Sequence, residues 1–454
     1  MVRSDNKCTG RVVSLVAGIV LTICATVQAG SWAVSRKFPL GVPVVRVMPD
    51  PQRPWVYAID RQDSNILFID SATGTVQKML YVGKDPTDCD IDPTGNFLYV
   101  ANSGPGTGLP GSWRIGVVTL SNQALVTSYI IPVVAENITA GRAGILYYNA
   151  GFDLWNSGDA HALDTTTGTD LGTFAVVKTR MAILSDKSRL FGQYTYTGNL
   201  GAMGDFDVST NPVALVDSLH YSPYPYGWDY DNYSLSGNDQ YLAYGQILFN
   251  PTNFTDQIGT FQEQVYALNY DGSVAFGRTG IWNTTTFPIH GNASIITNMP
   301  FPTTIMKFDN QAGLLYAFNN TDNSLYVIEP STANGIPLRW LQQYGLATND
   351  AVETLDSDND GYNNLQEWLL GSDPTNSSNP SVTFQLQWIA GSHLTVQATS
   401  PTRWYELQRT YNLVPASWQP ISKLQGSGNN LMFDVTTDMH QQSNAFYRLC
   451  PKLY

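Results

Sequence analysis

Short runs in which hydrophobic and polar residues alternate recur in the same order over the first three hundred residues. The segment AVSRKFPLGVPVVRVMPDPQRPWVYAIDRQDSNILFIDSATG begins at residue 33, and TVQKMLYVGKDPTDCDIDPTGNFLYVANSGPG begins at residue 75. Each passes through a hydrophobic strand that ends in glycine, an alternating strand, an Asp-Pro turn and an aromatic strand. Alternation with period two predicts β-strands, and the Asp-Pro and Thr-Gly corners predict tight turns between them.

The same unit returns further along the chain. Leu163–Asp164 precedes a Thr-Thr-Gly turn, Phe206–Asp207 begins a looser copy, and TTIMKFDNQAGLLYAFNNTDNSLYVIEPSTANG closes the series at residue 335. We count about six copies, starting near residues 43, 86, 133, 177, 225 and 302, and long inserts in the last two leave room for a seventh, degenerate copy. A period of roughly 40 to 50 residues is typical of blade-forming sheets, whereas tandem sandwiches need about 100.

The last copy lacks an outer strand, because SLYVIEPSTANG runs directly into a helical pattern. The segment WAVSRKFPLG near the beginning of the chain matches the outer strand TVQKMLYVG of the first copy and can supply the missing one. An N-terminal strand that completes the last sheet leaves no long exposed edge. We therefore predict an all-β fold in which residues 30–333 form a six- or seven-bladed β-propeller closed by its N-terminal strand.

The motif VYAIDRQDSNILFIDSATG, with LYVGKDP and FLYVANS in the following copy, resembles the YVTN family of bacterial β-propellers. The resemblance covers residues 33–333 and is clear in the first two copies. It implies the propeller fold. It implies little about activity, because the family includes binding proteins, surface-layer proteins and relatives of lactonases and quinoprotein dehydrogenase subunits.

A different pattern follows the repeats, in the stretch LDSDNDGYNNLQEWLLGSDP at residues 355–374. Aligned with a twelve-residue calcium loop, it has oxygen donors at positions 1, 3, 5, 7, 9 and 12, and Gly361 at position 6, where the chain turns sharply. The predicted ligands are Asp356, Asp358, Asp360, Tyr362 through its carbonyl, Asn364 through a water, and Glu367. Three aspartates this close repel one another without a cation, so we predict Ca²⁺ as the cofactor rather than a metal-free acidic linker.

Short helices are predicted on both sides of this loop. RWLQQYGL, residues 339–346, ends in a glycine cap, and Leu365, Trp368 and Leu369 recur at helical spacing before Gly371. The unit of residues 334–380 resembles the single EF-hand-like, dockerin-like or thrombospondin-type-3-like units of exported bacterial proteins. It lacks the second loop of a dockerin, and we expect its metal to hold shape between domains.

Six short alternating runs in residues 381–454 predict a small C-terminal β-sandwich. Its ending AFYRL, with WYELQRT and SWQPI, resembles modules that follow the calcium unit in other secreted bacterial proteins. Carriage to the cell surface and a carbohydrate contact by Trp388, Trp404 and Trp418 are two roles that would fit. Packing of these tryptophans in the core is the alternative that we favour.

The first 29 residues predict a secretory signal peptide. Arg3, Lys7 and Arg11 precede an apolar run, and Val27 and Ala29 fit a signal-peptidase site, with an uncleaved membrane anchor as the alternative. The segment carries three basic residues and one acid, so its removal takes the net charge from −13 to −15. An acidic chain without a basic patch argues against nucleic acid as a partner. No later apolar run reaches about 18 residues, so no stable membrane span is expected after cleavage.

Candidate chemistry within the ring is sparse. The aligned copies place charged residues on or near the innermost strands, namely Arg46, Asp88, Asp90, Arg142, Arg180, Asp231 and Lys307. One interpretation is a site at the channel mouth, with Asp88 and Asp90 as metal ligands. The other, which we favour, is a series of alternating salt bridges along a water-filled tunnel. The five histidines lack metal-ligand spacing and no GxSxG elbow is present. Cys89 and Cys450 are predicted as two free thiols or one long-range disulfide.

These patterns predict an exported, calcium-stabilised propeller that acts as a non-catalytic binding or cell-surface protein. Its expected ligand is an extracellular glycan, peptide or envelope component, and its expected location is secreted, periplasmic or cell-surface. The alternatives are a structural envelope component and an exported propeller enzyme, lactonase-like or quinoprotein-dehydrogenase-like, that uses acids at the channel mouth. Three or more carboxylate or amide oxygens converging at one channel end would favour an enzyme, whereas paired Arg and Asp would favour binding.

Overall fold

The structure is a computed structural model that describes most of the chain. The described residues are 31–104, 113–149, 159–174, 180–196, 199–220, 232–285, 287, 293–378, 387–389, 393–396, 403–411, 417–426, 429–436 and 445–452. The predicted signal peptide, residues 1–29, and Asp231 lie outside them. None of the helices in the described part of the chain is long and apolar enough to cross a membrane.

Seven four-stranded antiparallel sheets are present in the described residues between 31 and 331. The first three are β2 (Arg46–Pro49), β3 (Trp55–Asp60), β4 (Asn65–Asp70) and β5 (Val76–Tyr81); β6 (Pro86–Ile91), β7 (Phe97–Asn102), β8 (Trp113–Thr119) and β9 (Ala124–Ile131); and β10 (Asn137–Ala140), β11 (Ile145–Asn149), β12 (Ala160–Asp164) and β13 (Thr169–Phe174). The next three are β14 (Ala182–Ile183), β15 (Arg189–Tyr196), β16 (Asn199–Asp207) and β17 (Ala214–His220); β18 (Tyr233–Leu235), β19 (Leu242–Tyr244), β20 (Ile247–Asn250) and β21 (Asn253–Thr260); and β22 (Val265–Leu268), β23 (Val274–Gly277), β24 (Gly280–Asn283) and β25 (Ser294–Asn298). The last contains β26 (Met306–Asp309), β27 (Leu314–Asn319), β28 (Ser324–Ser331) and β1 (Ser31–Pro39).

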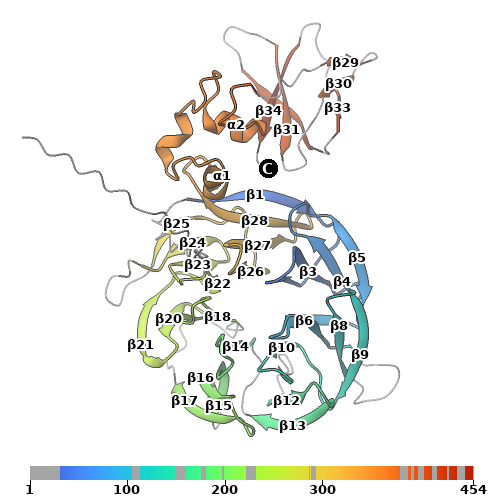
Figure 1. The fold of residues 1–454 in the computed structure, drawn as a ribbon, viewed down its shortest axis with the longest axis vertical. Coiled ribbons are helices and arrows are strands. Elements are labelled where there is room, and N and C mark those ends of the chain that lie inside the picture. The colour runs from blue at the N-terminus through green and yellow to red at the C-terminus, as the bar shows by residue number, and fades with distance from the viewer. Residues whose placement is uncertain are drawn as a thin grey trace, which may run out of the picture.

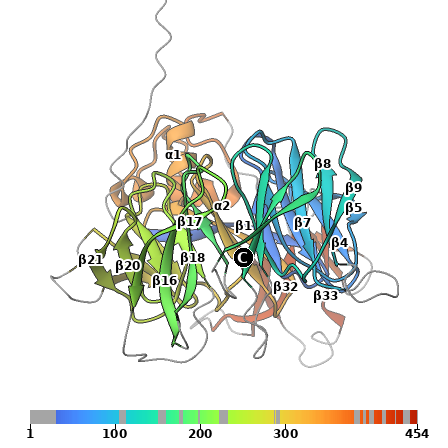
Figure 2. The same cartoon turned by 90° about the horizontal axis from the view of Figure 1, so that it is seen from below.

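The sheets follow one another around a ring, with the first strand of each near the axis and the fourth at the rim (Figure 1). Seen from below, strands β20 and β21 stand on one side of the ring and β4, β5 and β9 on the other (Figure 2). This is the arrangement of a β-propeller. The sheet β22–β25 lies within the fifth copy, one of the two in which the sequence pattern shows long inserts.

The strand β1 joins the last sheet, although it comes from the other end of the chain. It pairs antiparallel with β28, from Ser31 opposite Ser331 to Pro39 opposite Ser324, with one irregularity between Val34 and Arg36. The β1 segment overlaps the run WAVSRKFPLG that the pattern offers as the missing outer strand. The outer edge of β28 is therefore covered by main-chain hydrogen bonds instead of facing water.

The core is divided into clusters between neighbouring sheets. One cluster joins Tyr57 and Phe68 of the first sheet to Leu98 and Val100 of the second, and all four side chains are fully buried. The middle strands β3 and β4 are buried on both faces, whereas β5 alternates between half-buried and exposed positions. Continuous apolar runs therefore mark strands between two sheets, and alternation marks the rim.

The repeated aspartates set the turns between strands. The Asp70 side chain accepts hydrogen bonds from the backbone N–H groups of Ala72 and Thr73, and Gly74 follows at φ +72°. The Asp164 turn repeats this pattern and ends at Gly168 with φ +73°. Each turn needs an aspartate to accept the backbone hydrogen bonds and a glycine to adopt the left-handed conformation. The same residue types therefore recur in distant copies.

Two short helices, a 3₁₀ turn and two small sheets follow the ring. The helical segments are α1 (Leu338–Gln343), η1 (Asp350–Thr354) and α2 (Asn364–Leu370). The sheets are β29–β30–β33 and β32–β31–β34, formed by β29 (Gln387–Ile389), β30 (His393–Val396), β31 (Trp404–Thr410), β32 (Gln419–Gln425), β33 (Leu431–Asp434) and β34 (Phe446–Lys452). Leu394 and Phe433 of one sheet share a buried cluster with Tyr405 and Leu407 of the other.

The two cysteines within the described residues, Cys89 and Cys450, are free thiols. Cys89 lies in the core between the first two sheets and is fully buried, whereas Cys450 in β34 is half-buried. The sequence leaves a disulfide between them open, and the structure keeps them apart. Burial raises the pKa of the Cys89 thiol, which favours an inert, protonated side chain.

Candidate functional site

The acidic loop runs from the end of η1 to the start of α2. Asn363 and Gln366 form a capping box at the first turn of α2, and Gly371 ends that helix at φ +79°. Within the loop, Asn359 and Gly361 adopt positive φ values of 64° and 99°. These left-handed residues turn the backbone sharply, as position 6 of a calcium loop requires.

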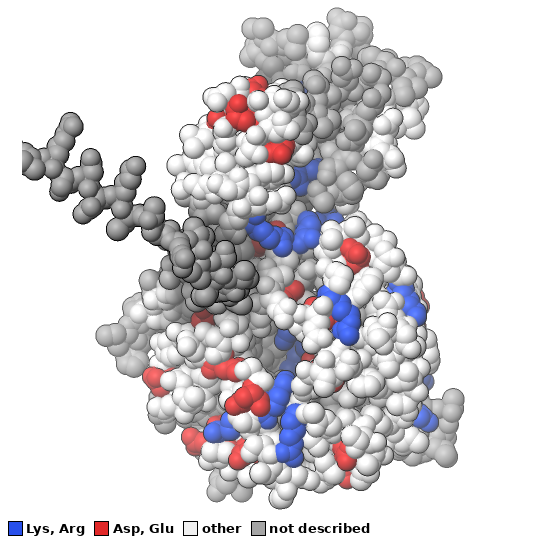
Figure 3. Space-filling model, in the orientation of Figure 1, with Lys and Arg blue, Asp and Glu red and all other residues white. Residues whose placement is uncertain are grey.

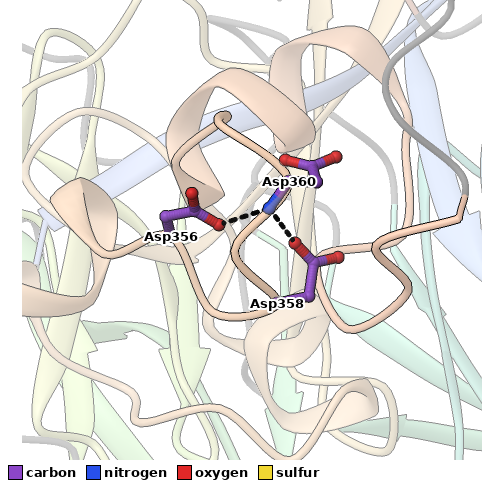
Figure 4. Close-up of side chains that lie close together, drawn as sticks. All are labelled: Asp356, Asp358 and Asp360. Carbon is purple, nitrogen blue, oxygen red and sulfur yellow. Dashed lines mark hydrogen bonds between the residues drawn. The ribbon is translucent and has the colours of Figure 1, made fainter.

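The loop brings three of the predicted ligands together (Figure 4). Asp356, Asp358 and Asp360 each present a carboxylate oxygen, and these oxygens lie within 4.8 Å of one another. Asp356 and Asp358 both accept a hydrogen bond from the backbone N–H of Asp360, each at 3.2 Å. Among the described residues no lysine, arginine or histidine forms an ion pair with any of them. Their mutual repulsion is therefore not offset by a basic side chain of the described chain.

The carboxylate of Glu367 comes from α2 and is fully buried. Burial and the charges of Asp358 and Asp360 raise its pKa to about 7. The hydroxyl of Ser372 donates to its Oε1 at 3.4 Å. Oε2 of Glu367 has no hydrogen-bond partner among the described residues, and neither has Oδ2 of Asp358 or of Asp360, although all three atoms are buried. Buried carboxylate oxygens without partners are costly, so this donor set fits a cation coordinated by oxygen.

The two other predicted ligands take different places. The N–H of Tyr362 donates to Asp360 at 2.8 Å, and the tyrosine itself is half-buried. Asn364 is fully buried, donates to the carbonyl of Val352 at 2.7 Å and accepts from the Ser357 hydroxyl at 2.9 Å. Its amide thus ties the loop to η1, and coordination through a water stays a prediction.

The unit that carries the loop contacts both neighbouring bodies. Its apolar centre is Ile336, Leu341, Val352 and Trp368. Asp350 of η1 accepts from the N–H of Ala333 at 2.9 Å, and Arg339 of α1 pairs with Glu329 of β28 at 3.3 Å. On the other side, the buried guanidinium of Arg403 lies 3.9 Å from the centre of the Trp368 ring and donates to the Trp368 carbonyl at 2.7 Å.

The C-terminal sheets also contact the strand that completes the ring. Gln425 of β32 donates to the carbonyl of Lys37 in β1 at 3.3 Å. The Lys37 ammonium lies 4.7 Å from the centre of the Trp404 ring, so this tryptophan packs at the boundary between the two bodies. Trp418 has Arg448 over its ring at 4.4 Å, and the side chain of Trp388 lies outside the described residues.

A second candidate site is a cavity of about 260 Å³ on the axis of the ring. Residues from the first strand of each of the seven sheets line it. Four of the predicted channel residues lie on three of these strands: Arg46 on β2, Asp88 and Asp90 on β6, and Lys307 on β26. Arg180, just before β14, is a fifth. Basic side chains gather around the hollow at the centre of the ring in Figure 3.

The aspartates that line the cavity interact with basic and backbone N–H groups of the protein. Asp88 pairs with Arg46 at 2.7 Å and accepts from the N–H of Ile138 at 3.2 Å. Asp90 accepts from the N–H groups of Ile91 and Ala140, at 3.0 and 2.8 Å. These carboxylates therefore join the second sheet to the first and the third, which is the paired arrangement that the sequence favours for the axis.

Sequence reasoning placed one residue at the channel that the structure puts elsewhere, and it missed two residues that line the cavity. Arg142 donates to the carbonyl of Ser209 and is not among the residues that line this cavity. Lys187 and Asp239 do line it, from the turns that follow β14 and β18. Asp239 accepts from the N–H of Ser185 at 2.8 Å. The pattern identifies these turns, but only the position of the cavity reveals which turn residues reach it.

Comparisons with known proteins support the fold alone. No family model matches the sequence, and no curated protein matches it. Among solved structures, the Myceliophteria thermophila Cps50 (Swd1) β-propeller domain has a TM-score of 0.52 at 11% identity, over 66% of this chain and 99% of that chain. Kuenenia stuttgartiensis hydrazine synthase has a TM-score of 0.49 at 13% identity, over 63% of this chain and 95% of that chain. The match to the Cps50 (Swd1) domain supports a β-propeller fold for this chain.

Proposed function

We propose that this chain is an exported β-propeller that binds an extracellular ligand on the axis of its ring without catalysing a reaction. The observation that carries the binding role is the axial cavity, which all seven inner strands line. Asp88, Asp90 and Asp239 accept backbone hydrogen bonds from neighbouring sheets and turns, and Asp88 pairs with Arg46, which supports a role for these acids in holding the ring together. The exported enzyme, lactonase-like or dehydrogenase-like, would have to use these same acids.

A structural envelope component is the second candidate function, and the rim of the ring favours it. Met79 and Tyr81 on β5 and Val126 and Ile130 on β9 are apolar side chains that are more than half exposed. Apolar side chains on the outer strands could pack against another copy or an envelope partner. Self-association of the purified mature chain, measured by sedimentation, separates this candidate from a monomeric binding protein.

We further propose Ca²⁺ as the cofactor, held by Asp356, Asp358, Asp360 and Glu367 with the Tyr362 carbonyl and Asn364. Residues 334–380 would then form an EF-hand-like connector between a seven-bladed YVTN-type propeller, closed by β1, and the C-terminal β-sandwich of residues 381–454. The buried oxygens without partners support the metal. The contact of Arg339 with Glu329 of β28 and that of Trp368 with Arg403 support the connecting role. The bound ion would supply positive charge that offsets the repulsion of the acids.

Export is proposed from the signal peptide of residues 1–29. Expression of the whole chain in a bacterial host, followed by cell fractionation and N-terminal sequencing, tests it. We expect a chain that begins at Gly30 outside the cytoplasm, whether secreted, periplasmic or at the cell surface. A full-length chain that stays in the cytoplasm contradicts the proposal.

The binding role is tested with purified residues 30–454. A thermal-shift screen against glycans, peptides and lactones, with lactone hydrolysis followed in the same samples, is expected to find a stabilising ligand and no turnover. Ser234→Trp fills the cavity and should abolish the stabilisation, whereas Ser218→Trp on the outer strand β17 should retain it. Turnover that depends on Asp88 or Asp90 would instead establish the enzyme.

A further inference from the structure

Among the described residues that line the axial cavity, basic side chains outnumber acidic ones, although the whole chain carries a net charge of −13. The basic residues are Arg46, Arg180, Lys187 and Lys307, and the acidic ones are Asp88, Asp90 and Asp239. Each of the three acids accepts a backbone hydrogen bond, as described above, and Asp88 also pairs with Arg46 at 2.7 Å. The described lining thus carries a net positive charge, which favours an anion as the ligand.

Lys307 and Lys187 are the two lining lysines, and neither ammonium group has an ion pair or a hydrogen bond within the described residues. Arg46, by contrast, is paired with Asp88. Lys307 stands on β26 between the buried residues Met306 and Phe308, is itself exposed to water, and lines the cavity. Desolvation by the surrounding protein lowers the pKa of Lys307, and the nearby charge of Arg46 lowers it further.

A neutral donor lies in the same cavity. The hydroxyl of Ser234 on β18 accepts a hydrogen bond from the N–H of Leu268 at 3.2 Å, and its own proton has no acceptor among the described residues. The amide of Asn232 donates to the carbonyls of Val265 and Tyr266, so its position is fixed by the neighbouring sheet. The cavity therefore offers an ammonium and a hydroxyl on a rigid frame, which are donors that suit an oxyanion.

We infer that the axial cavity binds a small organic anion through a carboxylate or phosphate group, with Lys307 as its main partner and Ser234 as a second donor. The inference rests on the proposed binding function and names the chemical class of its ligand. An anion beside Lys307 offsets the repulsion between the basic groups. Because the cavity shields the ion pair between Lys307 and the anion from bulk water, that pair is stronger than one on the surface. Neutral molecules of the same size gain no such stabilisation.

Isothermal titration calorimetry on residues 30–454 at low salt tests the inference, with glycolate and inorganic phosphate as the anions and ethylene glycol as the neutral control. We expect at least one anion to bind and ethylene glycol not to bind. Lys307→Met should weaken the anion at least tenfold, and Lys307→Arg should weaken it less. Lys78→Met on the outer strand β5 is the matched control and should leave the affinity unchanged.

A second measurement covers the case in which Lys307→Met does not fold. Labelling of the unaltered protein with an amine-reactive reagent, read by mass spectrometry, should show that the anion protects Lys307 and leaves Lys78 reactive. Equal binding by Lys307→Met, or no protection and no binding by either anion, overturns the inference. If a neutral glycan fills the cavity instead, the anion inference fails while the binding function stands, so the two failures are distinguishable.

Discussion

Glu367 is the residue that most sharply separates a metal site from an acidic surface loop. It is fully buried beside three aspartates, and one of its oxygens has no partner within the described residues. We expect Glu367→Gln to weaken Ca²⁺ binding by residues 30–454 at least about tenfold, or 1.4 kcal/mol, because the amide removes both charge and bidentate coordination. Calorimetry with Ca²⁺ measures this. Glu406→Gln, the same change in β31, should bind as the unaltered protein does, and equal affinity in both variants would refute the ligand assignment.

At this scale the sequence predicts the three aspartates that the structure brings together, because positions 1, 3 and 5 of one loop are necessarily close. It does not predict the place of Asn364. That amide is held by Val352 and Ser357, and the η1 turn that supplies Val352 has no clear periodicity in the sequence. The axial residues Lys187 and Asp239 escape prediction for a similar reason, since their role depends on which turns meet across the ring.

Among the elements, the turn between β4 and β5 shows how the ring depends on its N-terminal strand. Gly74 has φ +72°, and a Cβ built there would lie 2.0 Å from Cδ1 of Phe38 in β1. Gly313 has φ +68° and no heavy atom within 4 Å of such a Cβ. We expect Gly313→Ala to cost about 1–2 kcal/mol for its left-handed backbone, and Gly74→Ala to cost clearly more because β1 must also move. Thermal unfolding measures both, and equal losses would show that β1 does not pack there.

The contact between α2 and the C-terminal sheets gives a second prediction for the elements. Arg403 is 4% exposed. Its guanidinium lies over the Trp368 ring and donates to the Trp368 carbonyl, and these contacts join α2 to the C-terminal sheets. We expect Arg403→Met to destabilise the protein by about 2 kcal/mol or more, since cation–π pairs out of water are the strong ones. Arg409→Met is the control, because Arg409 lies 4.4 Å over Tyr411 in a less buried place. Equal effects in chemical denaturation would count against a structural joint at Arg403.

The elements themselves are predictable where propensity and pattern agree. The runs WVYAID and NILFID are buried on both faces and form β3 and β4. The sheet β22–β25 is harder to find, because three of its strands have only four residues, its pairing is irregular between Val265 and Ala267, and its turns lack the Asp-Thr-Gly pattern. The two predicted helices coincide with α1 and α2, because glycine caps mark their ends.

For the whole molecule, buried tyrosines predict a loss of stability at alkaline pH. Burial raises the pKa of Tyr147 to about 12, and burial together with Asp50 or Asp170 raises the pKa values of Tyr57 and Tyr148 further. Unfolded tyrosine has a pKa of about 10, so above that pH the unfolded chain releases protons that the folded chain retains, and stability falls as pH rises.

Absorbance at 295 nm and circular dichroism, recorded together during an alkaline titration, measure this effect. We expect part of the 25 tyrosines to ionise only as the circular dichroism of the fold is lost. Ionisation of all of them in one reversible step before unfolding would contradict the burial of these rings.

The central claim is that a Ca²⁺ ion in the acidic loop joins the ring to the C-terminal sheets. Hydrogen exchange of residues 30–454, compared in excess Ca²⁺ and in a calcium chelator, tests it most directly. The proposal predicts that Ca²⁺ slows exchange in the loop and α2. It also predicts slower exchange in β1, β31 and β32, where Lys37 contacts Trp404 and Gln425, with Glu367→Gln abolishing both effects. Identical exchange with and without Ca²⁺, or protection confined to the loop, would contradict the claim.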